Sequence, residues 1–208
     1  MKNVFIRIDD VFERDRRLEE LLYGLSEREI KFNLEIIPAL VKLDLFTYLE
    51  GFANYELHQH GFMHRNNSST AKKNEFGNLI DLTSSKNNIE KGIGQLKTKR
   101  NFFPIFSFPW DIASSEIIEY LPYLGFLGFS VSTSGNTPII HHQTIKEVSV
   151  FFDYSSKIIA SIDLGQWECF GFSVHYDQLD EKEINLLFNF IQKIKLTGFN
   201  FCYMSELL

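Results

Sequence analysis

The chain has 208 residues, enough for a substantial core, and we expect residues 1–208 to form one domain. Its net charge of −6 disfavours nucleic acid as a partner, because phosphate binding requires a basic face. No stretch approaches the ~20 apolar residues of a membrane span, and the N-terminus lacks a signal-peptide pattern, so we expect a cytoplasmic protein.

Apolar patterns along the chain predict strands that alternate with helices. The first half is expected to contain, in order, strand 3–8, helix 13–25, strand 32–37, helix 39–49, strand 54–59 and loop 65–78. The second half is expected to contain helix 82–100, strand 103–108, helix 114–124, strand 126–132, loop 134–144, strand 147–152, strand 170–174, helix 181–196 and strand 199–204. This alternation indicates an α/β fold of βα units around a parallel sheet.

The cysteines and serines of the chain argue against disulfide, cysteine-zinc and serine-triad chemistry. Cys169 and Cys202 are too few and too isolated for a disulfide framework or a cysteine zinc site. One disulfide between them is geometrically possible, but we expect two buried thiols in a reducing compartment. Ser130, Ser132 and Ser134 lie near a strand end, but no nucleophile elbow surrounds them, so a serine triad is not predicted.

Polar groups that can do chemistry follow several expected strands. They are Asp9-Asp10, His60, Pro109-Trp110-Asp111 and His175. In parallel α/β folds and barrels, the active site gathers at the carboxyl ends of the strands. These segments are therefore expected to meet.

The pair Asp9-Asp10 closes the first expected strand. Neighbouring strand residues point to opposite faces, so both carboxylates reach one pocket only if the strand has ended. One carboxylate would then bind an ion while the other takes a proton from water. The alternative is that Asp10 caps the following helix while Asp9 pairs with Arg7.

Three of the six histidines, His58, His60 and His64, lie within seven residues. Two imidazoles four residues apart can converge on one divalent ion, and an anionic third ligand, here one carboxylate of Asp9-Asp10, completes a common site. The alternative is a pair of surface or capping histidines. His58 either orients a ligand through a hydrogen bond or is a core histidine.

His175 ends an apolar strand, where packing does not require an imidazole. It could act as a general acid that protonates a leaving group on the side away from the metal, or it could be a core histidine. His141 and His142 fall in the expected loop 134–144 and are interpreted as exposed.

This combination resembles the NodB-type polysaccharide deacetylases of carbohydrate esterase family 4, in particular their divergent branch that opens with Arg-(Ile/Val)-Asp-Asp. Four of the family's ordered elements can be placed over nearly the whole chain, at residues 6–10, 56–64 with 74–77, 108–111 and 174–175. The resemblance implies a distorted (β/α) barrel that hydrolyses an N-acetyl or O-acetyl group on a small-molecule or oligosaccharide substrate, with N-acetyl expected.

The resemblance also implies roles for particular residues. Asp9 would be the catalytic base and His175 the general acid. A divalent ion, expected to be Zn²⁺, would be held by Asp10, His60 and His64. The third element, Pro109, Trp110 and Asp111, would form a wall of the substrate groove.

Two departures from the family pattern stand out. Val11 occupies a position where many members have Gly, and Phe108 stands where an Arg often precedes the third element's proline. In the family that Arg normally orients the catalytic Asp, so here either another group must do so or the activity is weak. Trp167 is a candidate for the Trp-bearing fourth element by composition alone.

Two other functions compete with hydrolysis. A carbohydrate-binding relative without activity would keep the fold, and the missing Arg favours it. A two-His-one-carboxylate iron oxygenase would use the same ligand types. Such oxygenase sites usually lie on antiparallel double-sheet folds, so the βα alternation disfavours this second alternative.

Overall fold

The structure is a computed structural model that describes residues 2–132, 145–148, 150–155 and 162–208. Its strands are β1 (Lys2–Val11), β2 (Phe32–Ile36), β3 (Tyr55–His60), β4 (Phe102–Ser107), β5 (Gly128–Ser130), β6 (Lys146–Glu147), β7 (Phe152–Asp153), β8 (Cys169–His175) and β9 (Phe199–Phe201). Its α-helices are α1 (Arg16–Glu27), α2 (Leu43–Leu49), α3 (Leu82–Leu96), α4 (Ser115–Tyr120) and α6 (Glu181–Leu196).

Short 3₁₀ helices connect several of these elements. They are η1 (Pro109–Asp111), η2 (Leu121–Leu124), η3 (Leu164–Gln166), η4 (Tyr176–Gln178) and η5 (Met204–Leu207). None of the helices in the described ranges is long and apolar enough to cross a bilayer.

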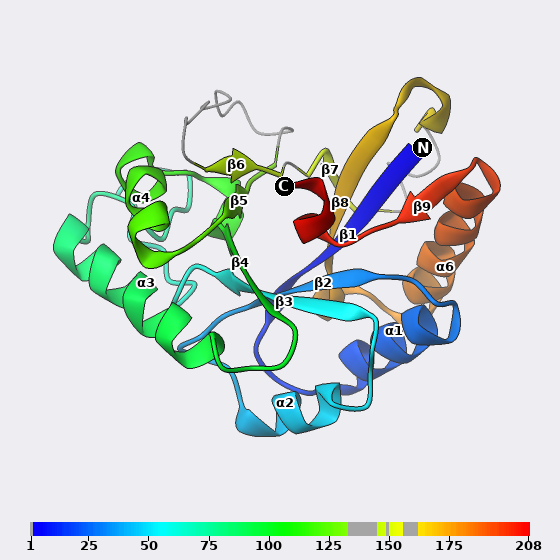
Figure 1. Cartoon of the computed structure of the whole chain (residues 1–208), viewed down its shortest axis with the longest axis horizontal. Helices are drawn as coiled ribbons and strands as arrows, with labels where there is room; N and C mark the ends of the chain where they lie inside the picture. Colours follow the sequence, from blue (N-terminus) through cyan, green and yellow to red (C-terminus); the bar gives the residue numbers. More distant parts are fainter. Residues whose placement is uncertain (1, 133–144, 149, 156–161) are drawn as a thin grey trace.

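The strands form one curved sheet in the order β6-β5-β4-β3-β2-β1-β8-β7, and β9 pairs with the beginning of β1. Every pairing between these strands is parallel. Figure 1 shows the α-helices arranged around the outside of the sheet. The expected α/β architecture, a distorted (β/α) barrel, is confirmed.

The segment from Lys146 to Tyr154 links the two edges of this sheet. The amide of Val148 donates to the carbonyl of Phe129 in β5, and that of Val150 donates to Val131, just after β5. The amide of Phe151 donates instead to Gly171 of β8. The prediction of one strand over 147–152 was therefore wrong. The chain crosses from one sheet edge to the other there, so the strand is divided into β6 and β7.

Helix α6 matches the expected helix 181–196, and α1 corresponds to the expected helix 13–25 but begins at Arg16 and ends at Glu27. Four leucines of α1 (Leu18, Leu21, Leu22 and Leu25) form its buried stripe. The side chain of Asp15 caps α1 by accepting from the amide of Leu18. Asp10 therefore caps no helix, and that part of the alternative interpretation was wrong.

The C-terminal segment covers the barrel at the end where the strands begin. The amide of Met204 donates to Asn33 Oδ1 at 2.9 Å, and the hydroxyl of Ser205 donates to Glu56. Figure 1 places this segment, in red, beside the centre of the sheet. The expected strand 199–204 accordingly ends at Phe201, because the chain turns inward to make these contacts.

Both cysteines have free thiols, but only Cys202 is buried. The expectation of two buried thiols was wrong for Cys169. It begins β8 at the rim of the sheet, where the side chain meets solvent.

Gly92 and Gly94 of α3 lie in contrasting surroundings. A Cβ added at Gly92 would meet Gln59 Nε2 at 2.2 Å, and that amide donates to the carbonyls of Gly61 and Ile89. A Cβ at Gly94 would meet nothing within 4 Å. Gly92 thus permits the close approach of α3 to β3, and Gly94 has no such role.

We expect Gly92→Ala to lower the free energy of unfolding by about 1–3 kcal/mol, because it displaces the buried Gln59 amide. Gly94→Ala, two residues along the same helix, should raise it by about 0.5–1 kcal/mol through helix propensity. Urea unfolding followed by circular dichroism measures both. Equal effects from the two substitutions would contradict this account of α3.

Candidate metal centre and active-site cleft

The predicted residues meet in a cleft of about 690 Å³ at the carboxyl ends of the strands. Asp9 and Asp10 come from β1, His60 ends β3, His175 ends β8, and His64 follows β3. The other lining residues, some of which the sequence did not single out, are Arg7, Lys73, Trp110, Asp111, Asp153 and Gln178.

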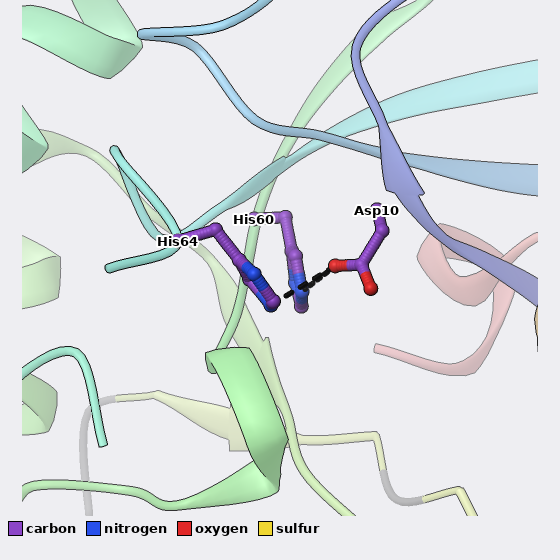
Figure 2. A group of neighbouring side chains, drawn as sticks. All are labelled: Asp10, His60 and His64. Atoms are coloured by element: carbon purple, nitrogen blue, oxygen red, sulfur yellow. Dashed lines mark ion pairs between the residues drawn. The ribbon is translucent and has the colours of Figure 1, made fainter. Parts of the chain in front are cut away.

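Asp10, His60 and His64 form a group that could hold a metal ion, with one ligand atom from each within 4.8 Å of the others. The Nε2 atoms of His60 and His64 lie 3.2 and 3.0 Å from Asp10 Oδ1 (Figure 2). Ligands at 2.0–2.2 Å around a tetrahedral ion lie about 3.3–3.6 Å apart, so the observed spacing is close to that geometry.

The chemistry of the three donors also suits a cation. Asp10 Oδ1 is buried and accepts no hydrogen bond of good geometry from the described residues. Burial opposes ionisation, but the adjacent imidazoles outweigh it and hold the pKa of Asp10 well below its ordinary value. An anionic oxygen facing two imidazoles is a donor set that divalent transition metals bind.

A distortion of β1 lets both aspartates face the cleft. The strand continues to Val11, so it has not ended at Asp10 as expected. Instead, its register with β2 shifts between Ile8 and Val11, and Asp10 has a left-handed φ of 60°. Such a bulge breaks the alternation of side chains, so Asp9 and Asp10 project toward one site.

The turn that carries His64 is held by a buried carboxylate. Glu75 accepts hydrogen bonds from the amides of Phe62, Met63 and His64, at 3.1, 2.7 and 3.2 Å. His64 itself has a φ of 51°, which is unusual for a residue with a Cβ. Glu75 therefore stabilises the strained turn that brings His64 to Asp10, a role the sequence analysis did not assign.

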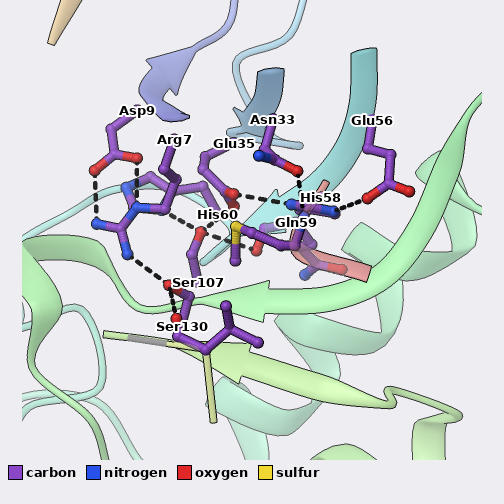
Figure 3. Close-up of polar contacts among 12 residues, drawn as sticks. Arg7, Asp9, Asn33, Glu35, Glu56, His58, Gln59, His60, Ser107 and Ser130 are labelled. Carbon is purple, nitrogen blue, oxygen red and sulfur yellow. Dashed lines mark hydrogen bonds and ion pairs between the residues drawn. The ribbon is translucent and has the colours of Figure 1, made fainter. Parts of the chain in front are cut away.

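His60 is fixed from behind by a chain of buried polar groups. Its Nδ1 lies 2.7 Å from Ser107 Oγ, and that hydroxyl donates to Glu35 (Figure 3). When Nε2 faces a metal, the proton resides on Nδ1 and is donated to Ser107. The same contacts that orient the ring therefore select its tautomer.

His58 continues this chain rather than contacting a ligand directly. It is fully buried, with Nδ1 3.0 Å from Glu35 and Nε2 3.3 Å from Glu56. Burial favours the neutral imidazole, but the two carboxylates outweigh it and raise the pKa of His58 to about 9. His58 is thus a charged link between Glu35 and Glu56.

Asp9 and His175 lie beside the three candidate ligands. His175 Nε2 lies 4.0 Å from Asp9 Oδ2 and 3.8 Å from Asp10 Oδ2. Burial raises the pKa of Asp9 above its ordinary value, and the positive charge of Arg7 only partly offsets this effect. The pairing of Asp9 with Arg7, which the alternative interpretation expected, is present at 2.8 Å.

The third predicted segment forms one side of the cleft. Trp110 and Asp111 line it, and the Trp110 ring lies 4.3 Å from that of His64, centroid to centroid. Pro109 is buried beneath them, close to Gly61. Trp110 and Asp111 have φ values of 54° and 55°, a strained backbone for residues with a Cβ.

Other residues considered from the sequence lie elsewhere. Trp167 packs against Phe151, Phe152 and Phe170 at the beginning of β8, opposite the end that carries His175. His141 and His142 lie outside the described residues.

Similar architectures occur in solved structures of carbohydrate esterases. A family 4 acetyl xylan esterase from Clostridium thermocellum, in complex with a cobalt ion, has 14% identity and a TM-score of 0.63, covering 99% of this chain and 90% of that chain. A peptidoglycan N-acetylglucosamine deacetylase has 13% identity and a TM-score of 0.66, covering 96% and 85%. This chain has the NodB-type fold of family 4 carbohydrate esterases.

This NodB-type fold is not confined to active enzymes. A mutant of a family 4 pseudoenzyme, with restored enzymatic activity, has 14% identity and a TM-score of 0.65, covering 96% of this chain and 64% of that chain. No family model and no curated protein matches the sequence. The structural similarity thus shows the fold, and the arrangement of the site residues is what bears on function.

The charged state of His58 should make stability depend on pH. Its pKa is raised from 6.5 to about 9 in the folded state, so its contribution is fully present below pH 6.5 and lost as pH rises through 9. Wild type should lose on the order of 3 kcal/mol of unfolding free energy relative to His58→Gln between these pH values. Urea unfolding in chelator measures the difference, and a constant gap between the two proteins would contradict the assignment.

Proposed function

We propose that this protein is a metal-dependent hydrolase that removes an acetyl group from a carbohydrate, with N-acetyl preferred to O-acetyl. The observation that carries the proposal is the convergence of Asp10, His60 and His64 within 4.8 Å, with Asp9 and His175 beside them. The cleft volume of about 690 Å³ is within the ~300–1,000 Å³ typical of small-ligand sites.

Asp10, His60 and His64 would hold the ion, which we expect to be Zn²⁺. A divalent ion bound there lowers the pKa of a water from 15.7 towards ~7 and polarises the acetyl carbonyl. Glu75 would hold the backbone of His64, and Ser107 would hold the ring of His60, so that both imidazoles are oriented toward the ion.

Asp9 would be the general base. Its carboxylate takes a proton from a water in the cleft, and the water oxygen attacks the acetyl carbon. The raised pKa of Asp9 makes it a stronger base than an exposed aspartate. Its carboxylate lies at the floor of the cleft and lines it, which is the placement that this role requires.

His175 would be the general acid. Its Nε2 faces the two aspartates, and its side chain is 29% exposed, so it can reach a substrate in the cleft. When the bond from the acetyl carbon to nitrogen or oxygen breaks, the imidazolium gives its proton to the departing amine or alcohol. Acetate and the deacetylated sugar are the products.

Trp110 and Asp111 would contact the sugar from one side of the cleft. Trp110 already covers His64, so a sugar placed against it lies near the candidate ligands. The alternative, a carbohydrate-binding protein without activity, was favoured by the missing Arg before Pro109. Arg7 pairs with Asp9 in this structure, so that argument loses its weight.

We expect His64→Ala and Asp10→Ala to lose bound metal and turnover together, because each removes one of three ligands. His175→Ala should retain the metal and lose about 10²–10⁴-fold in kcat. Elemental analysis gives metal content, and acetate release from an N-acetylglucosamine oligomer, with a chromogenic acetyl ester in parallel, gives turnover.

The controls separate the competing functions. Turnover that survives a chelator, or full metal occupancy in His60→Ala and His64→Ala, would refute the metal assignment. A wild-type protein that binds the oligomer and releases no acetate would instead be the inactive relative.

A further inference from the structure

The Arg7 guanidinium lies beneath the cleft, 1% exposed, and donates to two carboxylates at once. Its Nε and Nη2 donate to Asp9 Oδ1 and Oδ2, both at 2.8 Å, and Nη2 also donates to Asp111 Oδ1 at 2.9 Å. We propose that Arg7 is a positioning residue, which aims the carboxylate of Asp9 into the cleft and anchors the Trp110-Asp111 wall to it. This inference rests on the proposed function, in which Asp9 is the base.

The pairing with Arg7 fixes the orientation of the Asp9 carboxylate plane as well as its distance from the guanidinium. Two parallel N–H···O bonds join the planar guanidinium to the planar carboxylate, so rotation of the Asp9 side chain breaks at least one of them. Arg7 and Asp9 are two residues apart on β1 and therefore project from the same face of the strand. The base and the group that orients it are thus carried by one strand.

Arg7 is itself held from the opposite side. Its Nη1 donates to Ser130 Oγ at 2.9 Å (Figure 3). That hydroxyl donates in turn to the carbonyl of Val148 at 2.7 Å. Ser130 belongs to β5, which β2, β3 and β4 separate from β1, so the guanidinium spans the interior of the curved sheet. The orientation of Asp9 on β1 therefore also depends on β5, a strand that does not pair with β1.

The pairing with Asp111 accounts for the strained turn. Consecutive left-handed residues, Trp110 and Asp111, persist only when the surroundings hold them. Arg7 holds Asp111 from below, and Trp110 packs on His64 from the cleft side. One guanidinium therefore sets the distance between the proposed base and the wall that would contact the sugar.

A contribution to folding stability does not by itself explain why Arg7 is buried between Asp9 and Asp111. A buried ion pair often contributes no more than well-packed apolar side chains of similar volume, because desolvation offsets the attraction. Lys would preserve the charge, but its single ammonium cannot span both oxygens of Asp9 and reach Asp111 as well. Arg7→Lys therefore tests the geometry with the charge retained.

The experiment compares wild type with Arg7→Lys, Asp9→Asn and the double variant, all loaded with Zn²⁺. We expect Arg7→Lys to lower kcat about 10–100-fold, with KM changed less than about threefold and Zn²⁺ content unchanged. In the Asp9→Asn background, Arg7→Lys should have no further effect, because a positioning residue acts only through the group it positions. A merely structural role would lower both backgrounds alike.

Arg16→Lys is the matched control, because Arg16 makes an exposed pair with Glu20 at 2.7 Å on α1, away from the cleft. It should keep the kcat of wild type. Ser130→Ala supplies a second variant if Arg7→Lys does not fold, since Ser130 Oγ accepts from Arg7 Nη1 and Ser130 does not line the cleft. It should lower kcat when Asp9 is intact and have no further effect in the Asp9→Asn background.

The outcomes separate the two proposals. A wild-type protein without turnover overturns the proposed function and the base role of Asp9 together. If the wild type is active, two results overturn the inference about Arg7 alone. In the first, Arg7→Lys keeps kcat within about threefold of wild type. In the second, Arg7→Lys multiplies the loss caused by Asp9→Asn. If only Ser130→Ala can be measured, a loss that multiplies the loss caused by Asp9→Asn overturns the inference.

Discussion

The bulge at the end of β1 is the constraint on which the candidate site depends. A regular strand would send Asp9 and Asp10 to opposite faces of the sheet, and one of them would leave the cleft. The left-handed φ of Asp10 and the register shift against β2 place both carboxylates on the same side. A single strand can therefore supply a proposed ligand and a proposed base from adjacent positions.

Most of the strained backbone in the described residues belongs to this site. Asp10, His64, Trp110 and Asp111 all have positive φ values, and each is held by a specific partner or packing contact. Glu75 secures the turn of His64, and Arg7 secures Asp111. Strain of this kind costs of order 1–3 kcal/mol per residue, so the surrounding barrel must over-determine the conformation.

The buried polar layer below the cleft connects its two halves. Arg7, Glu35 and Ser107 lie among apolar strands, fully inside the barrel, and each satisfies a group that lines the cleft or supports one that does. Position 108, where the family pattern often has an Arg, lies instead in a cluster of phenylalanines. Phe108 is 0% exposed and packs against Phe76, Phe106 and Phe129, so its position belongs to the core.

The sequence by itself determined the alternation of strands and helices, the stripe of α1 and the residue types that end β1, β3 and β8, because these depend on local periodicity and on chemistry at strand ends. Only the tertiary structure decided the division of the expected strand 147–152, the bulge at Asp10 and the partners of Arg7 and Glu75. Each of these arises from hydrogen bonds between segments far apart in the chain, such as Arg7 with Ser130. Local sequence patterns do not determine which distant groups the fold brings into contact.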